Sequence, residues 1–149
     1  MTYSRTIIHS VLLISLLGLV ACNKPVVNAN VTRMTAQLSA SSVVPPTTST
    51  ASGKVDAYLD EKTNKFTWTI SYSGLTGEAT AAHFHGPAAV GTNAGPALPI
   101  VGSLASPIKG DAILSNEQKA DLLASKWYLN VHTAANPDGE IRGQVIVSH

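Results

Sequence analysis

The most regular stretch of the sequence is KVDAYLDEKTNKFTWTISYS, residues 54–73. Apolar and polar residues alternate on both sides of the polar group 60–65. Successive side chains of an extended strand point to opposite faces, so this period of two predicts two strands that each bury one face. The polar group between them is typical of a turn. The stretch therefore predicts a β-hairpin.

The same alternation appears in three further segments, residues 34–38, 127–131 and 141–147. Pro137-Asp138-Gly139 lies between the last two segments and is a strong turn signal. Trp68 and Trp127 both fall at apolar positions of the pattern, so we interpret them as anchors of the hydrophobic core.

One segment departs from the strand pattern. Ser115 can cap a helix that begins at Asn116, and Gln118 can reach back to complete a capping box. The residues 119–126 that follow carry only a small apolar face, which predicts a short helix packed on the strands. Many short strands with turns and one helix predict an all-β fold: a Greek-key β-sandwich, immunoglobulin-like or superoxide-dismutase-like, with one short crossover helix.

Residues 86–110 are rich in Gly, Pro and Ala and show no clear period. A connection of this length exceeds the usual one, and long loops are often functional. Residues 97–101 could add an edge strand, since Pro96 and Pro99 are tolerated where no neighbouring strand needs their missing N–H. The loop could also hold a protein or a glycan, which would make the domain a metal-free interaction module.

Residues 1–21 have the pattern of a removable secretory signal: Arg5, an apolar run over 11–20 and the small residue Ala21. Leu19-Val20-Ala21-Cys22 resembles the lipobox of bacterial lipoproteins, in which the cysteine is acylated after cleavage. Acyl chains hold a protein on a bilayer, so we expect a membrane tether at Cys22. Asn23 follows in place of the aspartate that favours inner-membrane retention in lipoproteins. We therefore expect the bacterial cell envelope, with the outer membrane favoured.

The expected organisation is a cleaved signal at 1–21, a flexible tether at 22–30 and one domain at 31–149. The chain has 10 Lys and Arg against 9 Asp and Glu, and loss of Arg5 with the signal would leave nine of each. No cluster of basic residues is present in the sequence. A protein that neutralises phosphates needs such a surface, so nucleic acid is excluded as an expected partner.

Three histidines are the candidate ligands of a metal ion. His83 and His85 lie two apart, so on a strand both rings point to one face about 6.5–7 Å apart. His132 lies on the polar face of its own strand and could complete the site. Three imidazoles suit Zn, Cu, Fe or Ni, and the usual order of affinities favours copper.

A purely structural role for these residues is the alternative. His83 and His85 could bond to the backbone around Gly86-Pro87, while His132 could be a polar surface residue. Glu140 could pair with Arg142 at the surface. Glu140 and Asn130 are also candidates for orienting a histidine ring.

Four ordered motifs carry a resemblance to a known family: AHFHGPA at 82–88, NAGP at 93–96, YLNVHT at 128–133 and GEIRGQ at 139–144. Together they resemble the CHRD domain, first named from chordin, over about residues 31–147. The resemblance implies an extracytoplasmic β-sandwich. In animals such domains belong to a secreted antagonist of growth factors, and bacterial members resemble isolated exported modules.

His83, His85 and His132 match the histidine positions of that family. Their arrangement is similar to the copper site of copper/zinc superoxide dismutases, which are also β-sandwiches. This chain lacks the fourth copper histidine, the zinc loop and the disulfide of those enzymes. We therefore expect a copper-binding module rather than an enzyme, with the interaction module as the alternative and a redox enzyme as the least favoured function.

Overall fold

The computed structural model describes residues 30–148. The signal, Cys22 and most of the tether predicted above lie outside this range. The secondary structure within it consists of β1 (Val31–Ser39), η1 (Ala40–Ser42), β2 (Ser52–Asp60), β3 (Lys65–Ser73), β4 (Ala79–His85), β5 (Pro96–Pro99), β6 (Ile108–Ile113), α1 (Asn116–Leu123), β7 (Tyr128–Thr133), β8 (Ile141–Gln144) and β9 (Ile146–Val147).

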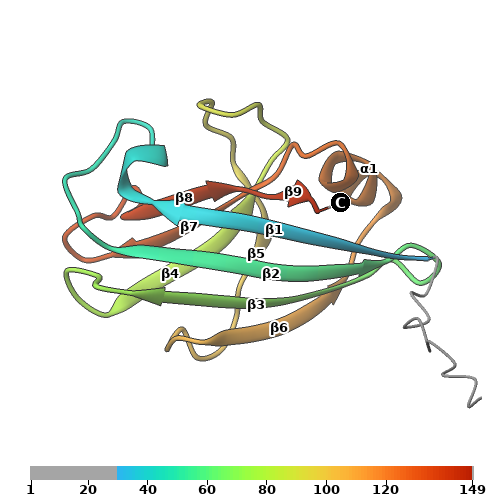
Figure 1. Ribbon diagram of the computed structural model, residues 1–149, viewed down its shortest axis with the longest axis horizontal. Helices are drawn as coiled ribbons and strands as arrows, with labels where there is room; N and C mark the ends of the chain where they lie inside the picture. The colour runs from blue at the N-terminus through green and yellow to red at the C-terminus, as the bar shows by residue number, and fades with distance from the viewer. Residues whose placement is uncertain (1–29, 149) are drawn as a thin grey trace, which may run out of the picture.

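The all-β fold with one α-helix is confirmed. The strands form one sheet in the order β5-β4-β7-β8-β1-β2-β3-β6, with β9 paired to β1 outside this path. The sheet curls, so that β1, β2, β3 and β6 form one layer and β5, β4, β7 and β8 form the other (Figure 1). The two layers of the expected sandwich are thus halves of a single curled sheet. They are joined where Ser39 of β1 pairs with Arg142 of β8.

The hairpin predicted over residues 54–73 is present as β2 and β3, which pair from Ser52↔Ser73 to Asp60↔Lys65. Its inward side chains, such as Leu59 and Phe66, are fully buried. Trp68 and Trp127 also lie in the core, as predicted, and their rings pack around Phe66 and Phe84 from the opposite layers. The hydrophobic core therefore lies between the two layers.

Helix α1 begins at Asn116, and both hydrogen bonds of the predicted capping box between Ser115 and Gln118 are formed. It connects β6 in one layer with β7 in the other, so it is the crossover that the sequence predicts. Its buried residue is Leu122. Within residues 30–148, no helix has the length and apolarity that a membrane span requires.

Several boundaries differ from the sequence prediction, among them the end of the helix, which lies at Leu123 rather than near residue 126. The segment 141–147 is two strands, because the chain leaves β7 after Gln144 and pairs with β1 from Ile146. The edge strand expected at 97–101 is present as β5 over Pro96–Pro99. The loop predicted to end at residue 110 ends earlier, because β6 starts at Ile108. Gly110, at an inward position of β6, lies against the Trp68 ring, where a Cβ would be 2.7 Å from the indole. Because this inward position carries glycine instead of an apolar side chain, the strand pattern is weak there.

Candidate metal centre

The outer face of β4, β7 and β8 brings polar residues into rows across the strands. In the antiparallel register, His83 lies opposite Asn130, which lies opposite Arg142. The neighbours Phe84 and Leu129 point the other way and are fully buried in the core. Alternation along the strands therefore places the histidines on one face, as the sequence predicts.

This polar face is covered by loops. His85 and His132 expose only 8% and 9% of their surface. The loop that follows His85 bonds to its ring through Ala94, and the loop that follows β7 bonds to the His132 ring through Pro137. The interpretation of His132 as a polar surface residue is therefore wrong, because the chain folds back over the strand that carries it.

The three histidine rings meet at one point. His83 Nδ1 lies 3.3 Å from His132 Nε2. One ring nitrogen from each of His83, His85 and His132 lies within 4.8 Å of the other two. The ring centroids are 5.5 Å apart for His83 and His85, 5.1 Å for His83 and His132, and 6.1 Å for His85 and His132.

Two of the rings are oriented by hydrogen bonds from Nδ1 to backbone carbonyls. His85 Nδ1 lies 3.0 Å from the oxygen of Ala94, and His132 Nδ1 lies 2.9 Å from that of Pro137. A carbonyl can only accept a hydrogen bond, so each Nδ1 carries the proton and each Nε2 presents its lone pair. His85 Nε2 is buried and has no hydrogen-bond partner among residues 30–148. A buried nitrogen with a free lone pair is what a metal-coordinating histidine needs.

The environment of His83 and His85 favours the neutral ring, which is the form that binds metals. Burial lowers the pKa of His83, and the neighbouring His132 lowers it further. Burial also lowers the pKa of His85; the hydrogen bond to Ala94 opposes this effect, and His83, His132 and Arg142 add to it. When the pKa of an imidazole is lower, protons compete less with a metal ion for the lone pair of the ring nitrogen.

One separation between the ring nitrogens matches that of two ligands on a first-row transition metal. Metal–nitrogen bonds of about 2.0–2.1 Å place two tetrahedral ligands about 3.3 Å apart, and His83 Nδ1 and His132 Nε2 are separated by 3.3 Å. Within the described residues, the cluster of possible ligands consists of the three histidines. A bound ion would therefore keep a coordination position for water or another small ligand.

Glu140 lies beside this site without contacting a histidine. Its carboxylate is fully buried and accepts hydrogen bonds from the hydroxyls of Ser49, Thr76 and Thr133 at 2.6–2.7 Å. The surface pair expected between Glu140 and Arg142 is wrong: both residues are buried, and Arg142 bonds to the loop 92–93 instead.

Asn130 acts on the histidine cluster through the loop that carries Pro137 and Asp138. Its Nδ2 donates to the oxygen of Asp138 at 3.0 Å, and so holds the loop whose Pro137 accepts from His132. Its Oδ1 is buried without a partner among the described residues. Asn130 thus makes its hydrogen bond to the loop, and none joins its side chain to a histidine ring in the described part of the chain.

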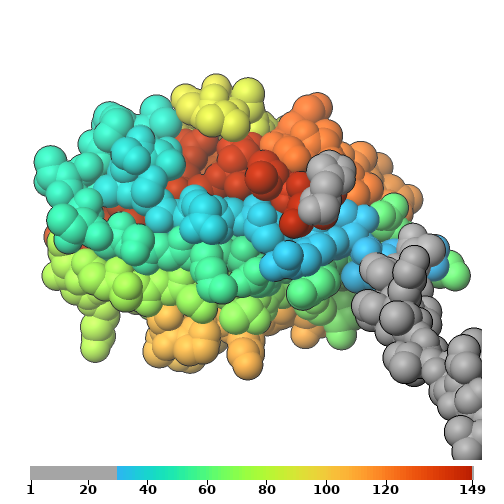
Figure 2. Space-filling view, in the orientation of Figure 1, coloured from blue at the N-terminus to red at the C-terminus, as the bar shows by residue number. Residues whose placement is uncertain are grey.

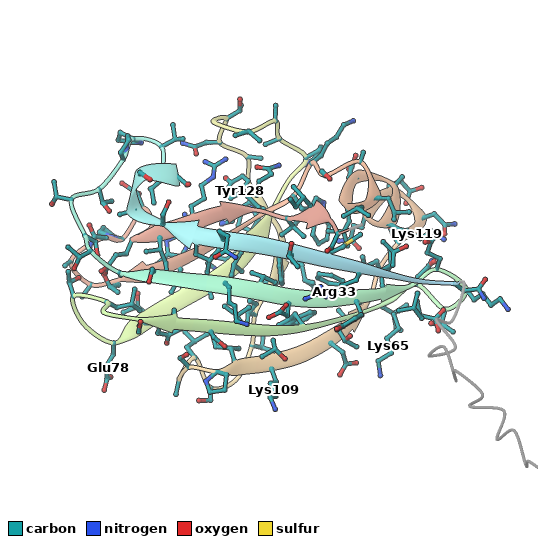
Figure 3. All side chains as sticks on the ribbon, viewed as in Figure 1. Arg33, Lys65, Glu78, Lys109, Lys119 and Tyr128 are labelled. Carbon is teal, nitrogen blue, oxygen red and sulfur yellow. The ribbon has the colours of Figure 1, made fainter. Side chains whose placement is uncertain are left out.

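Tyr128 is a residue of the site for which sequence reasoning gave no role. Its ring stacks on His85, with centroids 4.9 Å apart and planes 5° from parallel. Its hydroxyl donates to the oxygen of Ala94 and accepts from the Ala94 N–H. Figure 3 shows Tyr128 on β7 beneath the loop that covers the polar face. The alternation that placed His132 on this face also places Tyr128 there, so the signal was present in the sequence.

Comparison with known proteins identifies the family. The family model of the CHRD domain matches residues 34–145, which include β2 to β8 and all three histidines. Searches of curated proteins and of solved structures gave no match. Because the family model covers most of the chain, this protein belongs to the CHRD domain family.

Proposed function

We propose that this domain binds a transition-metal ion through His83, His85 and His132, with copper favoured. The observation that carries the proposal is the convergence of three ring nitrogens, two of them on rings fixed by hydrogen bonds to backbone carbonyls. Metal-binding histidines almost always donate their other ring N–H to such an acceptor. A histidine cluster with only a packing role would not need an unpartnered, buried nitrogen at His85.

Copper is favoured by the chemistry of the donor set. Three imidazoles without a carboxylate or a thiolate suit copper, zinc, iron or nickel better than calcium or magnesium. Among the divalent ions, copper(II) binds such sites most tightly. The role that we propose is a binding module that holds the ion.

The test is a titration of the purified, chelator-treated protein with Cu²⁺ and Zn²⁺, followed by calorimetry and electron paramagnetic resonance. We expect one Cu²⁺ per chain with nitrogen ligands in the spectrum. Loss of an outer hydrogen-bond partner of a ligand costs about 10–100-fold in affinity. The double variant His83→Ala, His85→Ala should therefore lose at least about 100-fold.

The double variant Lys109→Ala, Asp111→Ala is the matched control, because these exposed residues are also two apart on a strand and lie outside the cluster. Near-ultraviolet circular dichroism of the tryptophans checks that each variant keeps its folded core. Equal copper affinity of the double variant and the parent protein would refute the proposal.

We further infer that acylated Cys22 tethers the domain to a membrane of the bacterial cell envelope, with the outer membrane favoured. The support is the lipobox-like sequence 19–22. Labelling of cells with radioactive palmitate, followed by membrane fractionation, tests it. Cys22→Ala should lose both the label and the membrane association. Retention of both by this variant would contradict the tether.

A further inference from the structure

Arg142 is a buried cation with no anionic partner among residues 30–148. Only 2% of its surface is exposed. Its guanidinium donates to the Asn93 side-chain oxygen and to the Thr92 carbonyl, both at 2.7 Å, and lies 3.5 Å from the centroid of the Tyr128 ring. All these partners are neutral. The Nε atom makes no hydrogen bond to the described residues.

The ion pairs formed within residues 30–148 do not include Arg142; they are Arg33–Asp56, Lys54–Asp56 and Lys65–Asp111. Glu140 is the nearest acidic residue in sequence, and its carboxylate accepts hydrogen bonds from the hydroxyls of Ser49, Thr76 and Thr133. Buried charges are normally paired, because removing a charge from water is costly. Arg142 is therefore poised to accept an anion.

A cavity of about 360 Å³ lies over Arg142. Its floor is β8, and its walls are the segment after β1 and the loop after β4; Figure 2 shows the red surface of β8 between these two segments. Arg142 is the only charged residue that lines it. The other lining residues are four with apolar side chains, Val43, Val44, Pro46 and Val90, together with Ser41, Ser42, Gly91 and Gln144. The volume is that of a site for a small ligand.

We propose that this cavity binds a small monocarboxylate with an apolar chain. The planar guanidinium matches a carboxylate in geometry as well as in charge. A single cation balances a single negative charge, whereas a phosphate monoester would bring about −1.5 to −2. The valines and the proline favour a hydrocarbon chain over a sugar or a polyol. The site is distinct from the three histidines and needs no metal ion.

Binding of hexanoate to the purified, chelator-treated protein tests the proposal by calorimetry, with hexanol as the uncharged analogue. Charge-assisted hydrogen bonds are about twice as strong as neutral ones, so hexanoate should bind at least about tenfold more tightly than hexanol. Arg142→Gln keeps hydrogen-bond donors and removes the charge, and should lose the same factor.

Val90→Asp provides a second variant that does not threaten the fold. Val90 is 79% exposed and lines the cavity, so the new carboxylate should repel hexanoate and weaken binding several-fold. Val101→Asp is the matched control, because Val101 is 86% exposed and lies outside this cavity. It should bind hexanoate as the parent protein does.

The outcome separates this site from the histidine cluster. The variant His83→Ala, His85→Ala should keep hexanoate affinity even if it loses copper, and failure of copper binding would leave the hexanoate result intact. Equal binding of hexanol and hexanoate would overturn the proposal. So would an equal loss of hexanoate affinity in Val90→Asp and Val101→Asp.

Discussion

Substitution of Glu140 by Gln should destabilise the protein at neutral pH and remove much of its sensitivity to acid. The Glu140 carboxylate is fully buried and accepts from three hydroxyls, from the Thr76 N–H at 2.8 Å and from the Asn136 amide at 3.2 Å. Burial alone would raise its pKa. The hydrogen bonds from Ser49, Thr133 and Thr76 outweigh burial and lower the pKa from 4.5 to about 2.

The magnitude follows from linkage between protonation and folding. At 1.36 kcal/mol for each pKa unit, the drop from 4.5 to about 2 is worth about 3 kcal/mol of folding free energy. Because the folded protein has the lower pKa, this stability is fully present above about pH 5. It is lost as the pH falls toward 2, where the folded protein must also bind the proton.

Urea unfolding of the parent protein and Glu140→Gln between pH 2 and pH 7 measures this effect. The parent should be about 3 kcal/mol more stable at pH 7, and the difference should shrink to less than about 1 kcal/mol near pH 2. Other carboxylates titrate equally in both proteins and cancel. Glu78→Gln is the matched control, since Glu78 is exposed (Figure 3). A difference that stays constant with pH would refute the reasoning.

Three further substitutions test separate parts of the structure. Gly139→Ala places a Cβ 2.2 Å from the Asn130 side chain at a φ of +121°. The free energy of unfolding should fall by more than about 1 kcal/mol, and calorimetry should show weaker copper binding. Unchanged stability and copper affinity would contradict the contact between Gly139 and Asn130. Ser115→Ala removes the cap of α1 and should cost about 1 kcal/mol in urea unfolding while copper affinity stays the same. Leu129→Ala empties a fully buried core position and should cost about 2–5 kcal/mol, and a cost below 1 kcal/mol would contradict the packing described here.

Strand periodicity carries most of the fold prediction, because alternation is a local property of the chain. The hairpin of β2 and β3 and the capped start of α1 are both readable from a few neighbouring residues. β6 was missed because the middle one of its inward positions is Gly110, whose lack of a side chain makes room for Trp68 from another strand. That requirement comes from tertiary packing, so no local pattern could reveal it.

In the candidate site, too, the features that depend on local sequence were predicted and those that depend on tertiary contacts were not. Strand alternation placed His83, His85 and His132 on polar faces, and the structure brings them together. Burial of that face depends on loops that return from elsewhere in the chain, through contacts such as Asn93 to the Val44 carbonyl. The sequence therefore could not show that Glu140 and Arg142 are buried and have separate partners.

The histidine cluster depends on one register between β4 and β7. His83 and His85 flank Phe84, which lies fully buried in the core opposite Leu129. A slip of one residue would turn Phe84 outward and both imidazoles into the apolar core, which is a large cost in free energy. The core residue between the two histidines thus fixes where their rings lie, so under the proposed function the site is formed in advance of the ion. Binding energy then need not be spent on ordering the strands, and two of the rings are already held by Ala94 and Pro137.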